Sequence, residues 1–237
     1  MKIDIEYKTD YNNGRDPDKS DSILRDYHQL LWTKTLPNGK MFNLTASVSK
    51  PYRLLHLSDL GNFSLSSDAI AHSYSRMKNK KMSEIVNAFP RQDIDRFFNL
   101  ACTIGGYIVF PSNKIEGKST INMERGINHQ IKDRFDLTLE CIRRWYVYEK
   151  SPLFDCLDRY SDFFQLFTNF RGYTNFFFLE DLVDFESESI RFWLPFEEFG
   201  ITHPLPSNIN EYREYMKNVS YFVNNRNMRI DKLINSL

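Results

Sequence analysis

The sequence predicts an α+β fold in which helices predominate, with a small antiparallel or mixed sheet from the N-terminal third packed against a helical C-terminal part. Short segments with strand patterning lie before residue 66, and the run at 107–110 is the most strand-like in the chain. Beyond Ser119 the periodicity is mainly helical. Since no linker-like stretch divides the chain, we expect residues 1–237 to form a single globular domain.

Local patterns place the elements of the first half. Alternating apolar residues predict an opening strand at 3–7, and Asn-Gly and Asp-Pro steps predict a turn-rich segment at 10–21. Ser20 or Asp21 is expected to cap a helix that ends near Trp32. The remaining expected elements are strands at 42–47, 52–57, 62–65 and 107–110, and helices at 66–77, from Ser83 onward, and at 91–103.

Helices fill the expected second half. They are predicted at 128–148, 152–170 and 176–183, followed by a C-terminal helix that Ser207 or Asn208 caps and that breaks or bends at 224–227. Aromatic residues are abundant, with 20 Phe, 13 Tyr and 3 Trp, and Phe gathers between 163 and 199. This composition favours a large ring-packed core, although the rings of 163–178 could instead form an apolar surface for a protein partner.

Composition excludes several functional classes. Basic and acidic residues balance at 31 each, so there is no strong signal for nucleic-acid binding. The charged N-terminus has no apolar signal region, and no apolar run is long enough to span a membrane. Cys102, Cys141 and Cys156 form no close-spaced pair. We therefore interpret them as reduced, buried packing residues, consistent with a cytoplasmic location.

The stretch from Lys114 to Gly126 carries the side chains of an anion site. Its candidate ligand-binding residues are Lys118, Thr120, Asn122 and Arg125, close to the start of a predicted helix whose backbone N–H groups would add to them. The order of residues matches neither a phosphate-binding P-loop nor a dinucleotide-binding motif. A polar loop with an Asn cap is the alternative.

Arg134 is a further candidate for ligand binding, as a buried clamp. On a helix over 128–148 it lies on the flank of the apolar stripe, where a charge must either extend to solvent or find a partner. Asp136 is expected on the other face of that helix. We therefore expect the partner of Arg134 to be Asp155, Asp158 or Asp162.

The same expected helix has a polar face that could support acid/base or metal chemistry. Its candidate catalytic residues are His129, Asp133, Asp136 and Glu140. An ordinary solvated helix face is the alternative interpretation. No motif identifies a cofactor, a resident metal or a nucleophile, so the sequence does not decide whether the protein is an enzyme.

Several phrases of the chain resemble an uncharacterised bacterial family, a domain of unknown function. They are DYNNGRDPDKSD, YHQLLWTKTLPNGKMF, TIGGYIVFP, STINMERG and DRFDLTLECIRRWY, and the resemblance runs from about Asp10 to Val183. It implies a bacterial or phage-associated intracellular protein. It brings no reaction, cofactor or catalytic residue.

Three functional hypotheses follow. The first is a protein that binds, and could process, a small phosphate-bearing ligand such as a nucleotide. The second is a non-catalytic interaction or regulatory module that uses an aromatic surface around 163–178. The third is a metal-dependent hydrolase that uses the carboxylate and histidine face.

Overall fold

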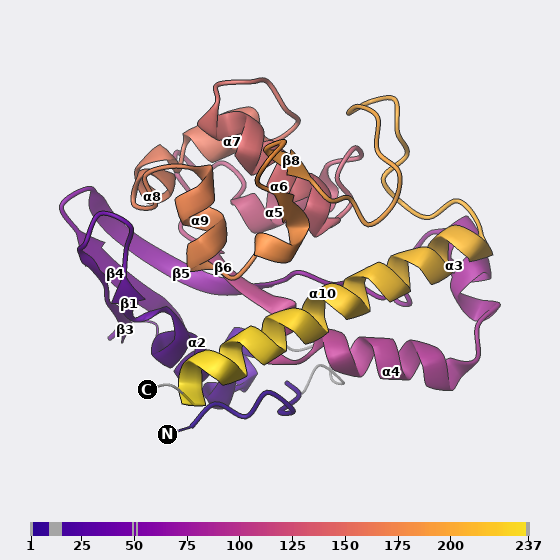
Figure 1. The fold of residues 1–237 in the computed structure, drawn as a ribbon, viewed down its shortest axis with the longest axis horizontal. Helices are drawn as coiled ribbons and strands as arrows, with labels where there is room; N and C mark the ends of the chain where they lie inside the picture. The colour runs from indigo at the N-terminus through magenta and orange to yellow at the C-terminus, as the bar shows by residue number, and fades with distance from the viewer. Residues whose placement is uncertain (1, 10–15, 49, 51, 236–237) are drawn as a thin grey trace.

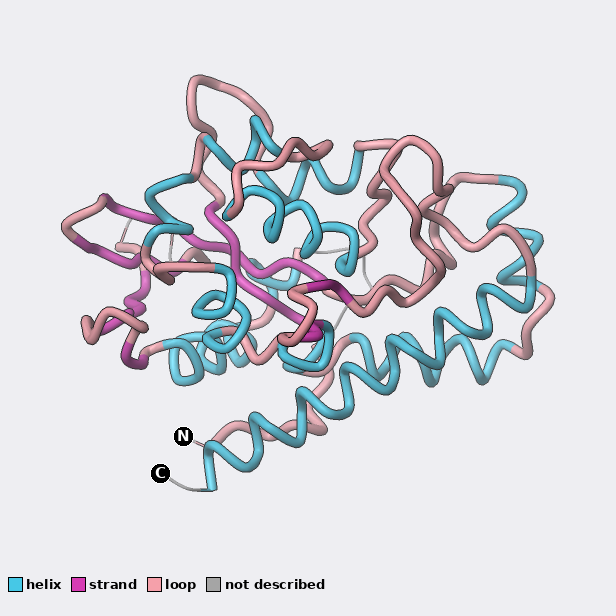
Figure 2. The backbone as a smooth tube through the Cα atoms, turned by 45° about the horizontal axis from the view of Figure 1, so that its top comes forward, coloured by secondary structure: helices cyan, strands magenta, loops and turns pink. Residues whose placement is uncertain are grey.

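The computed structural model describes residues 2–9, 16–48, 50 and 52–235. Within them the fold is α+β with helices predominating, as the sequence predicts. Figure 1 shows the sheet flanked on one side by a group of short helices and on the other by the long C-terminal helix, beside which the helix of residues 91–101 runs. Figure 2 shows the strands crossing the middle of the molecule between these helical parts.

The main sheet has four antiparallel strands in chain order. They are β3 (Leu44–Ala46), β4 (Leu54–Ser58), β5 (Gly61–Ala69) and β6 (Tyr107–Pro111). The strands predicted at 42–47, 52–57, 62–65 and 107–110 all fall on strand segments. Two smaller ladders join β1 (Lys34–Thr35) to β2 (Met41–Phe42) and β7 (Val183–Asp184) to β8 (Ser189–Ile190). The opening strand predicted at 3–7 is wrong, because residues 2–9 form no strand.

Strand β5 is longer than predicted and replaces the helix expected at 66–77. Ser66, Ser67 and Asp68 resemble capping residues, but they pair with Phe110, Val109 and Ile108 of β6. The backbone N–H and C=O groups of these residues form hydrogen bonds with β6, which is distant in sequence. Sheet pairing therefore overrides the local preference for the start of a helix. This extension of β5 matters because it forms the floor of the candidate site.

The described residues of the first half contain four helices. Helix α1 (Pro17–Ser20) precedes α2 (Ser22–Trp32), in which the Asp21 carboxylate accepts a hydrogen bond from the Leu24 N–H as predicted. Helix α3 (Lys80–Asn87) is capped by Asn79 instead of Ser83. Helix α4 (Arg91–Ala101) confirms the helix predicted there and leads into a 3₁₀ turn, η1 (Ile104–Gly106). Residues 10–15 of the predicted turn-rich segment lie outside the described residues.

The second half contains more and shorter helices than predicted. The helix expected at 128–148 begins only at Phe135, and the one expected at 152–170 is divided in two. The C-terminal helix has no break at 224–227. The elements are α5 (Ile121–Ile127), α6 (Phe135–Tyr146), α7 (Phe154–Asp158), α8 (Ser161–Gln165), α9 (Phe170–Phe176), the 3₁₀ turn η2 (Glu180–Leu182) and α10 (Ile209–Asn235).

Aromatic rings fill the space between the sheet and the short helices, as the composition predicts. Phe163 and Phe167 are fully buried, and the Phe163 ring packs edge-on against Phe63 of β5 at 5.7 Å between centroids. All three cysteines are free and buried, which confirms their expected packing role. In the part of the chain that the structure describes, no helix combines the length and apolar character needed to cross a membrane.

Candidate functional site

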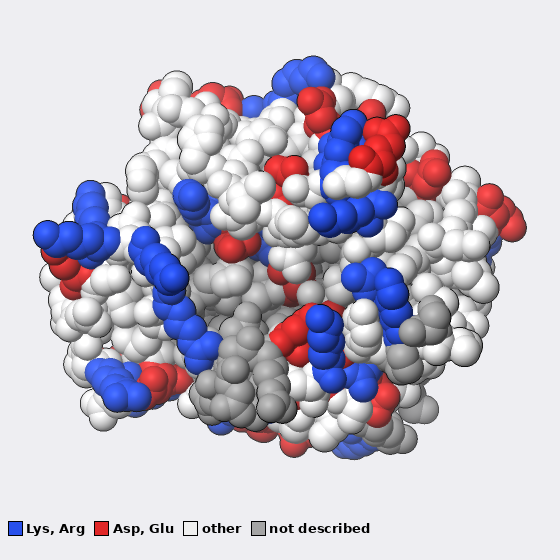
Figure 3. Space-filling model, turned by 180° about the vertical axis from the view of Figure 1, so that it is seen from behind, with Lys and Arg blue, Asp and Glu red and all other residues white. Residues whose placement is uncertain are grey.

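A polar cavity of about 460 Å³ lies over the end of β5. Figure 3 shows a hollow near the centre of the corresponding face, with acidic and basic side chains around it. The side chains that line it are mostly carboxylates, hydroxyls, amides and rings from segments far apart in sequence. The polar ones are Asp16, Asp18, Lys19, Tyr52, Arg53, Ser66, Ser67, Asp68, His72, Tyr107, Asn122 and Asp133.

Helix α1 is fastened to the floor of the cavity by Asp18. Its carboxyl group accepts hydrogen bonds from the Ser67 N–H at 2.9 Å and the Ser67 hydroxyl at 2.5 Å. Burial raises the pKa of the Asp18 carboxyl to about 7, although the Ser67 hydrogen bond opposes the shift. The cavity wall therefore contains a carboxyl group that is partly protonated near neutral pH.

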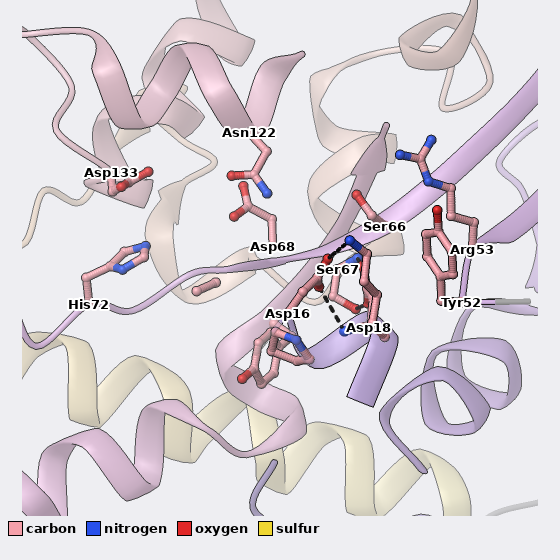
Figure 4. Close-up of a pocket in the computed structure, with 14 residues that line it drawn as sticks. Asp16, Asp18, Tyr52, Arg53, Ser66, Ser67, Asp68, His72, Asn122 and Asp133 are labelled. Atoms are coloured by element: carbon pink, nitrogen blue, oxygen red, sulfur yellow. Dashed lines mark hydrogen bonds and ion pairs between the residues drawn. The ribbon is translucent and has the colours of Figure 1, made fainter. Parts of the chain in front are cut away.

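Basic side chains stand at one end of the cavity. Arg53 precedes β4 and donates one hydrogen bond to the Ser112 carbonyl at 3.3 Å. Lys19 extends from α1 over the Tyr52 ring at 5.5 Å, so it belongs to the same end. Figure 4 shows Arg53 and Tyr52 together, apart from the group formed by His72, Asn122 and Asp133. Both basic side chains of the lining, Lys19 and Arg53, thus stand at one end of the cavity, and Asp133 stands toward the other.

Asp133 supplies the carboxylate at the second end of the cavity. It lies between α5 and α6, where Lys132 and Asp133 both adopt the left-handed conformation, with φ of 47° and 60°. Non-glycine residues pay an energetic cost there, and such strain gathers at functional sites. From the described part of the chain the Asp133 carboxylate receives no hydrogen bond, although Arg125 binds its backbone carbonyl at 3.1 Å. The backbone is therefore held in a strained form that turns this carboxylate toward the cavity (Figure 4).

His72 follows β5 and faces Asp133 across the cavity. Its backbone is held by Tyr215, whose hydroxyl donates to the His72 carbonyl at 3.0 Å. The Nε2 atom is buried and has no hydrogen-bond partner among the described residues. Burial lowers the pKa of His72, while the Asp133 carboxylate opposes the shift. His72 therefore presents a neutral imidazole at this end.

Arg125, a predicted ligand contact, lies behind the cavity wall. Its guanidinium is fully buried and donates to the Asp68 carboxylate at 2.5 Å, the Ala69 carbonyl at 2.9 Å and the Thr138 hydroxyl at 3.2 Å. Burial lowers the pKa of Arg125, but the Asp68 and Asp133 carboxylates outweigh this and raise it above its usual value. The pair is ionic and internally satisfied, so Arg125 supports the wall and neutralises Asp68.

The other predicted residues of the loop before α5 have separate positions. Asn122, in the first turn of α5, lines the cavity. Thr120 is buried and caps α5 by accepting a hydrogen bond from the Met123 N–H at 3.4 Å. Lys118 is exposed and pairs with Glu116 at 3.0 Å. Of the candidates Lys118, Thr120, Asn122, Arg125 and Arg134, the structure places Asn122 alone in the lining.

Arg134 is buried, as expected, but the prediction of its partner is wrong. Its Nε and Nη2 atoms donate to the two oxygens of Asp136 at 3.1 and 2.5 Å. We expected Asp136 on the opposite face because we placed both residues within one helix. Arg134 is instead the N-cap of α6, with an extended backbone at φ −70° and ψ 116°, so the two side chains meet. The Pro204 carbonyl accepts a third hydrogen bond at 3.1 Å.

The four candidate catalytic residues do not share a helix face. His129 and Asp133 precede α6, and His129 is exposed. Asp136 and Glu140 are buried, and Glu140 binds Arg143 and Arg144 at 2.8 and 2.7 Å. Glu140 therefore lies in a partly buried ion-pair network, in contrast to the alternative of an ordinary solvated helix face. Within the described ranges, no three His, Cys, Asp or Glu side chains are arranged to hold a metal ion.

Sequence reasoning missed most of the cavity. Asp18, Ser67 and His72 were not connected, because the helix predicted at 66–77 hid the extended strand that places them together. Phe63 and Leu65 are buried at alternate positions of β5, but this alternation does not continue, because Ser67 and Ala69 are half-buried and Asp68 is buried. The alternation at Phe63 and Leu65 indicates a strand there and gives no signal for its extension to Ala69.

The fold and the cavity define the class of this molecule as a helix-rich α+β protein with a polar, mixed-charge cavity over one antiparallel sheet. The model of the family of unknown function DUF6994 matches residues 1–230, so the chain belongs to this family. No curated protein and no solved structure matches the chain.

Proposed function

We propose that the chain binds a small phosphate-bearing ligand of the nucleotide kind in the cavity over β5. The observation that carries the proposal is that the two ends of the cavity differ in their side chains, with the basic ones at one end. Arg53, with Lys19 over the adjacent Tyr52 ring, would bind the phosphate. Asn122 and Asp133, which lie apart from Arg53 in Figure 4, would bind hydroxyl or amine groups. Arginine and lysine are the side chains that recognise phosphate, and arginine does so through a planar fork.

The carboxylates around the cavity are compatible with an anionic ligand because most are compensated. Asp68 is paired with Arg125 at 2.5 Å, and Asp16 lies 3.8 Å from Lys19. The raised pKa of Asp18, caused by burial, leaves that group partly neutral near pH 7. Asp133 remains as an acceptor for ligand hydroxyl groups, at the end away from Arg53.

The proposal assigns the anion contact to different residues from those that the sequence suggested. Arg125 and Arg134 are buried, and their guanidinium groups donate hydrogen bonds to oxygen atoms of the protein. The aromatic rings Phe163, Phe164 and Phe167 lie in the core, so the proposal makes no use of an aromatic surface.

Calorimetric titration with ribose 5-phosphate and with adenosine and guanosine 5′-monophosphates tests this function. We expect binding that Arg53→Ala weakens roughly tenfold or more, which is the scale of one lost charge-assisted contact. Asn122→Ala should also weaken it. Arg91→Ala is the matched control, because Arg91 is an exposed arginine on α4 that pairs with Asp95 away from the cavity. Absence of binding by every ligand, or equal binding by Arg53→Ala, would overturn the proposal.

A further inference from the structure

A second cavity of about 260 Å³ adjoins the first. The two share Ala69, His72, Tyr107 and Asp133 in their linings, so they meet at His72 and Asp133. The second one is mainly apolar. Its walls include Tyr74, Met77, Phe98 and Ala101.

The backbone around the second cavity carries the same kind of strain as the first. Tyr74 adopts φ of 55°, an uncommon conformation for a bulky residue, and its hydroxyl donates to the carbonyl of the equally strained Lys132 at 3.2 Å. Of the strained residues Tyr74, Lys132 and Asp133, Asp133 lines both cavities and Tyr74 lines the second, whereas the other non-glycine residues with positive φ, Glu116, Tyr148, Thr168, Phe178 and Glu188, line neither. Strain of this kind persists only where the surrounding structure enforces it.

His72 provides a specific polar atom at that junction. His28 and His56 also have a buried Nε2 without a partner in the described chain, so the lack of a partner is not by itself a sign of a ligand. His72 differs because it lines both cavities. A buried acceptor or donor is costly unless it is bonded, and a group entering from the cavity would satisfy it.

We infer that the two cavities form one bipartite site in which the apolar compartment holds a heteroaromatic base and His72 Nε2 accepts a hydrogen bond from a base N–H. The inference rests on the proposed function, in which the first cavity holds the sugar and phosphate. A flat ring matches the chemistry of the compartment, because aromatic and thioether side chains pack well against ring faces and edges. Asp133, which borders both compartments, then faces the sugar hydroxyls.

The experiment compares ribose 5-phosphate with the four common nucleoside 5′-monophosphates by calorimetric titration. The intact protein should bind at least one nucleotide roughly tenfold more tightly than ribose 5-phosphate, since a single buried hydrogen bond is worth about one factor of ten. His72→Phe keeps a ring but removes the acceptor, and Ala101→Leu narrows the apolar compartment. Each should abolish the preference for the nucleotide, and Ala101→Leu, which changes a residue of the second cavity alone, should leave the affinity for ribose 5-phosphate unchanged.

His56→Phe is the matched control, because His56 is a buried histidine that lines neither cavity. Circular dichroism and thermal unfolding establish that each variant is folded, and either cavity variant alone decides the test. If the protein binds ribose 5-phosphate and binds no nucleotide more tightly, the inference is overturned and the proposed function stands. A tighter binding of the nucleotide that either folded cavity variant retains would also overturn it. Binding of neither class of ligand would overturn both proposals.

Discussion

Single residues around the cavity show how burial changes the role that a side chain can play. From the sequence, Arg125 and Arg134 have the chemistry of ligand contacts, but both guanidinium groups are fully buried and bound to Asp68 and Asp136. Removing one partner of such a buried pair typically lowers the free energy of unfolding by about 3–5 kcal/mol. These arginines therefore contribute to stability. Sequence could predict that Arg134 is buried, because it flanks an apolar stripe. It could not predict that the N–H groups of both guanidinium groups already donate hydrogen bonds to backbone carbonyls of the protein.

Asp18 yields a prediction about pH. Burial raises the pKa of its carboxyl from 3.8 to about 7, so between these values the folded state binds more protons than the unfolded state. The free energy of unfolding should therefore fall as pH rises through this window and level off above it. Asp18→Asn mimics the protonated acid, and its stability relative to the parent should grow by on the order of 1 kcal/mol per pH unit there.

Urea unfolding at pH 4 to 8 measures this difference. Asp155→Asn, a substitution at an exposed carboxyl, controls for the loss of one acid group. A stability difference between Asp18→Asn and the parent that stays constant from pH 4 to 7 would contradict the prediction.

At the scale of elements, the junction between α5 and α6 shows where periodicity stops being informative. Ile131 and Phe135 are both fully buried, so their spacing fits a continuous helix, yet α6 begins only at Phe135. The spacing of apolar residues indicates which residues face the core, but it carries no information about the sign of the backbone angle φ. That angle is positive at Lys132 and Asp133, so the helix cannot continue through them. The sequence therefore predicts α6 well, but it does not predict the loop before α6 that turns the Asp133 carboxylate toward the cavity.

The strain in this loop can be relieved at Lys132 without touching the cavity. Lys132→Gly should raise the free energy of unfolding by roughly 0.5–1 kcal/mol, because glycine adopts φ of 47° without a steric cost. Lys132→Ala removes the same side chain but keeps the Cβ atom, so it should give no such gain. Guanidinium unfolding of the two variants side by side measures the effect, and equal stabilities would show that the backbone there is not strained.

At the scale of the whole molecule, α10 joins the parts. It runs the length of the molecule beside α4 and lies against η1 (Figure 1). Arg226 donates to the Phe177 carbonyl and to the carbonyls of Gly105 and Tyr107, so it joins two segments that are distant in sequence. The break predicted at 224–227 is wrong because α10 continues through these residues, of which Arg226 and Asn227 are buried anchors. Composition and periodicity predicted the helix, while its partners depend on contacts across more than half the chain.

Asn227 tests this role of α10. Its side chain accepts from the Gly105 N–H and donates to the Thr103 hydroxyl, both at 2.8 Å. Asn227→Ala should lower the free energy of unfolding by about 1–3 kcal/mol, because it leaves a buried backbone N–H without a partner. Asn224→Ala, one turn earlier on the exposed face, should be neutral or slightly stabilising, since alanine favours helix. Thermal unfolding compares the two, and stabilisation by both would refute the anchoring role.

The cavity is built from stretches of chain that run from Asp16 to Asp133, and this has a kinetic consequence. Its walls come together only after the loops between those stretches have closed and β6 has joined β5. A ligand that recognises the finished cavity has nothing to hold during the early steps of folding. Its stabilisation would therefore appear mainly as slower unfolding. During synthesis, a growing chain would acquire the capacity to bind only after Asp133 has emerged.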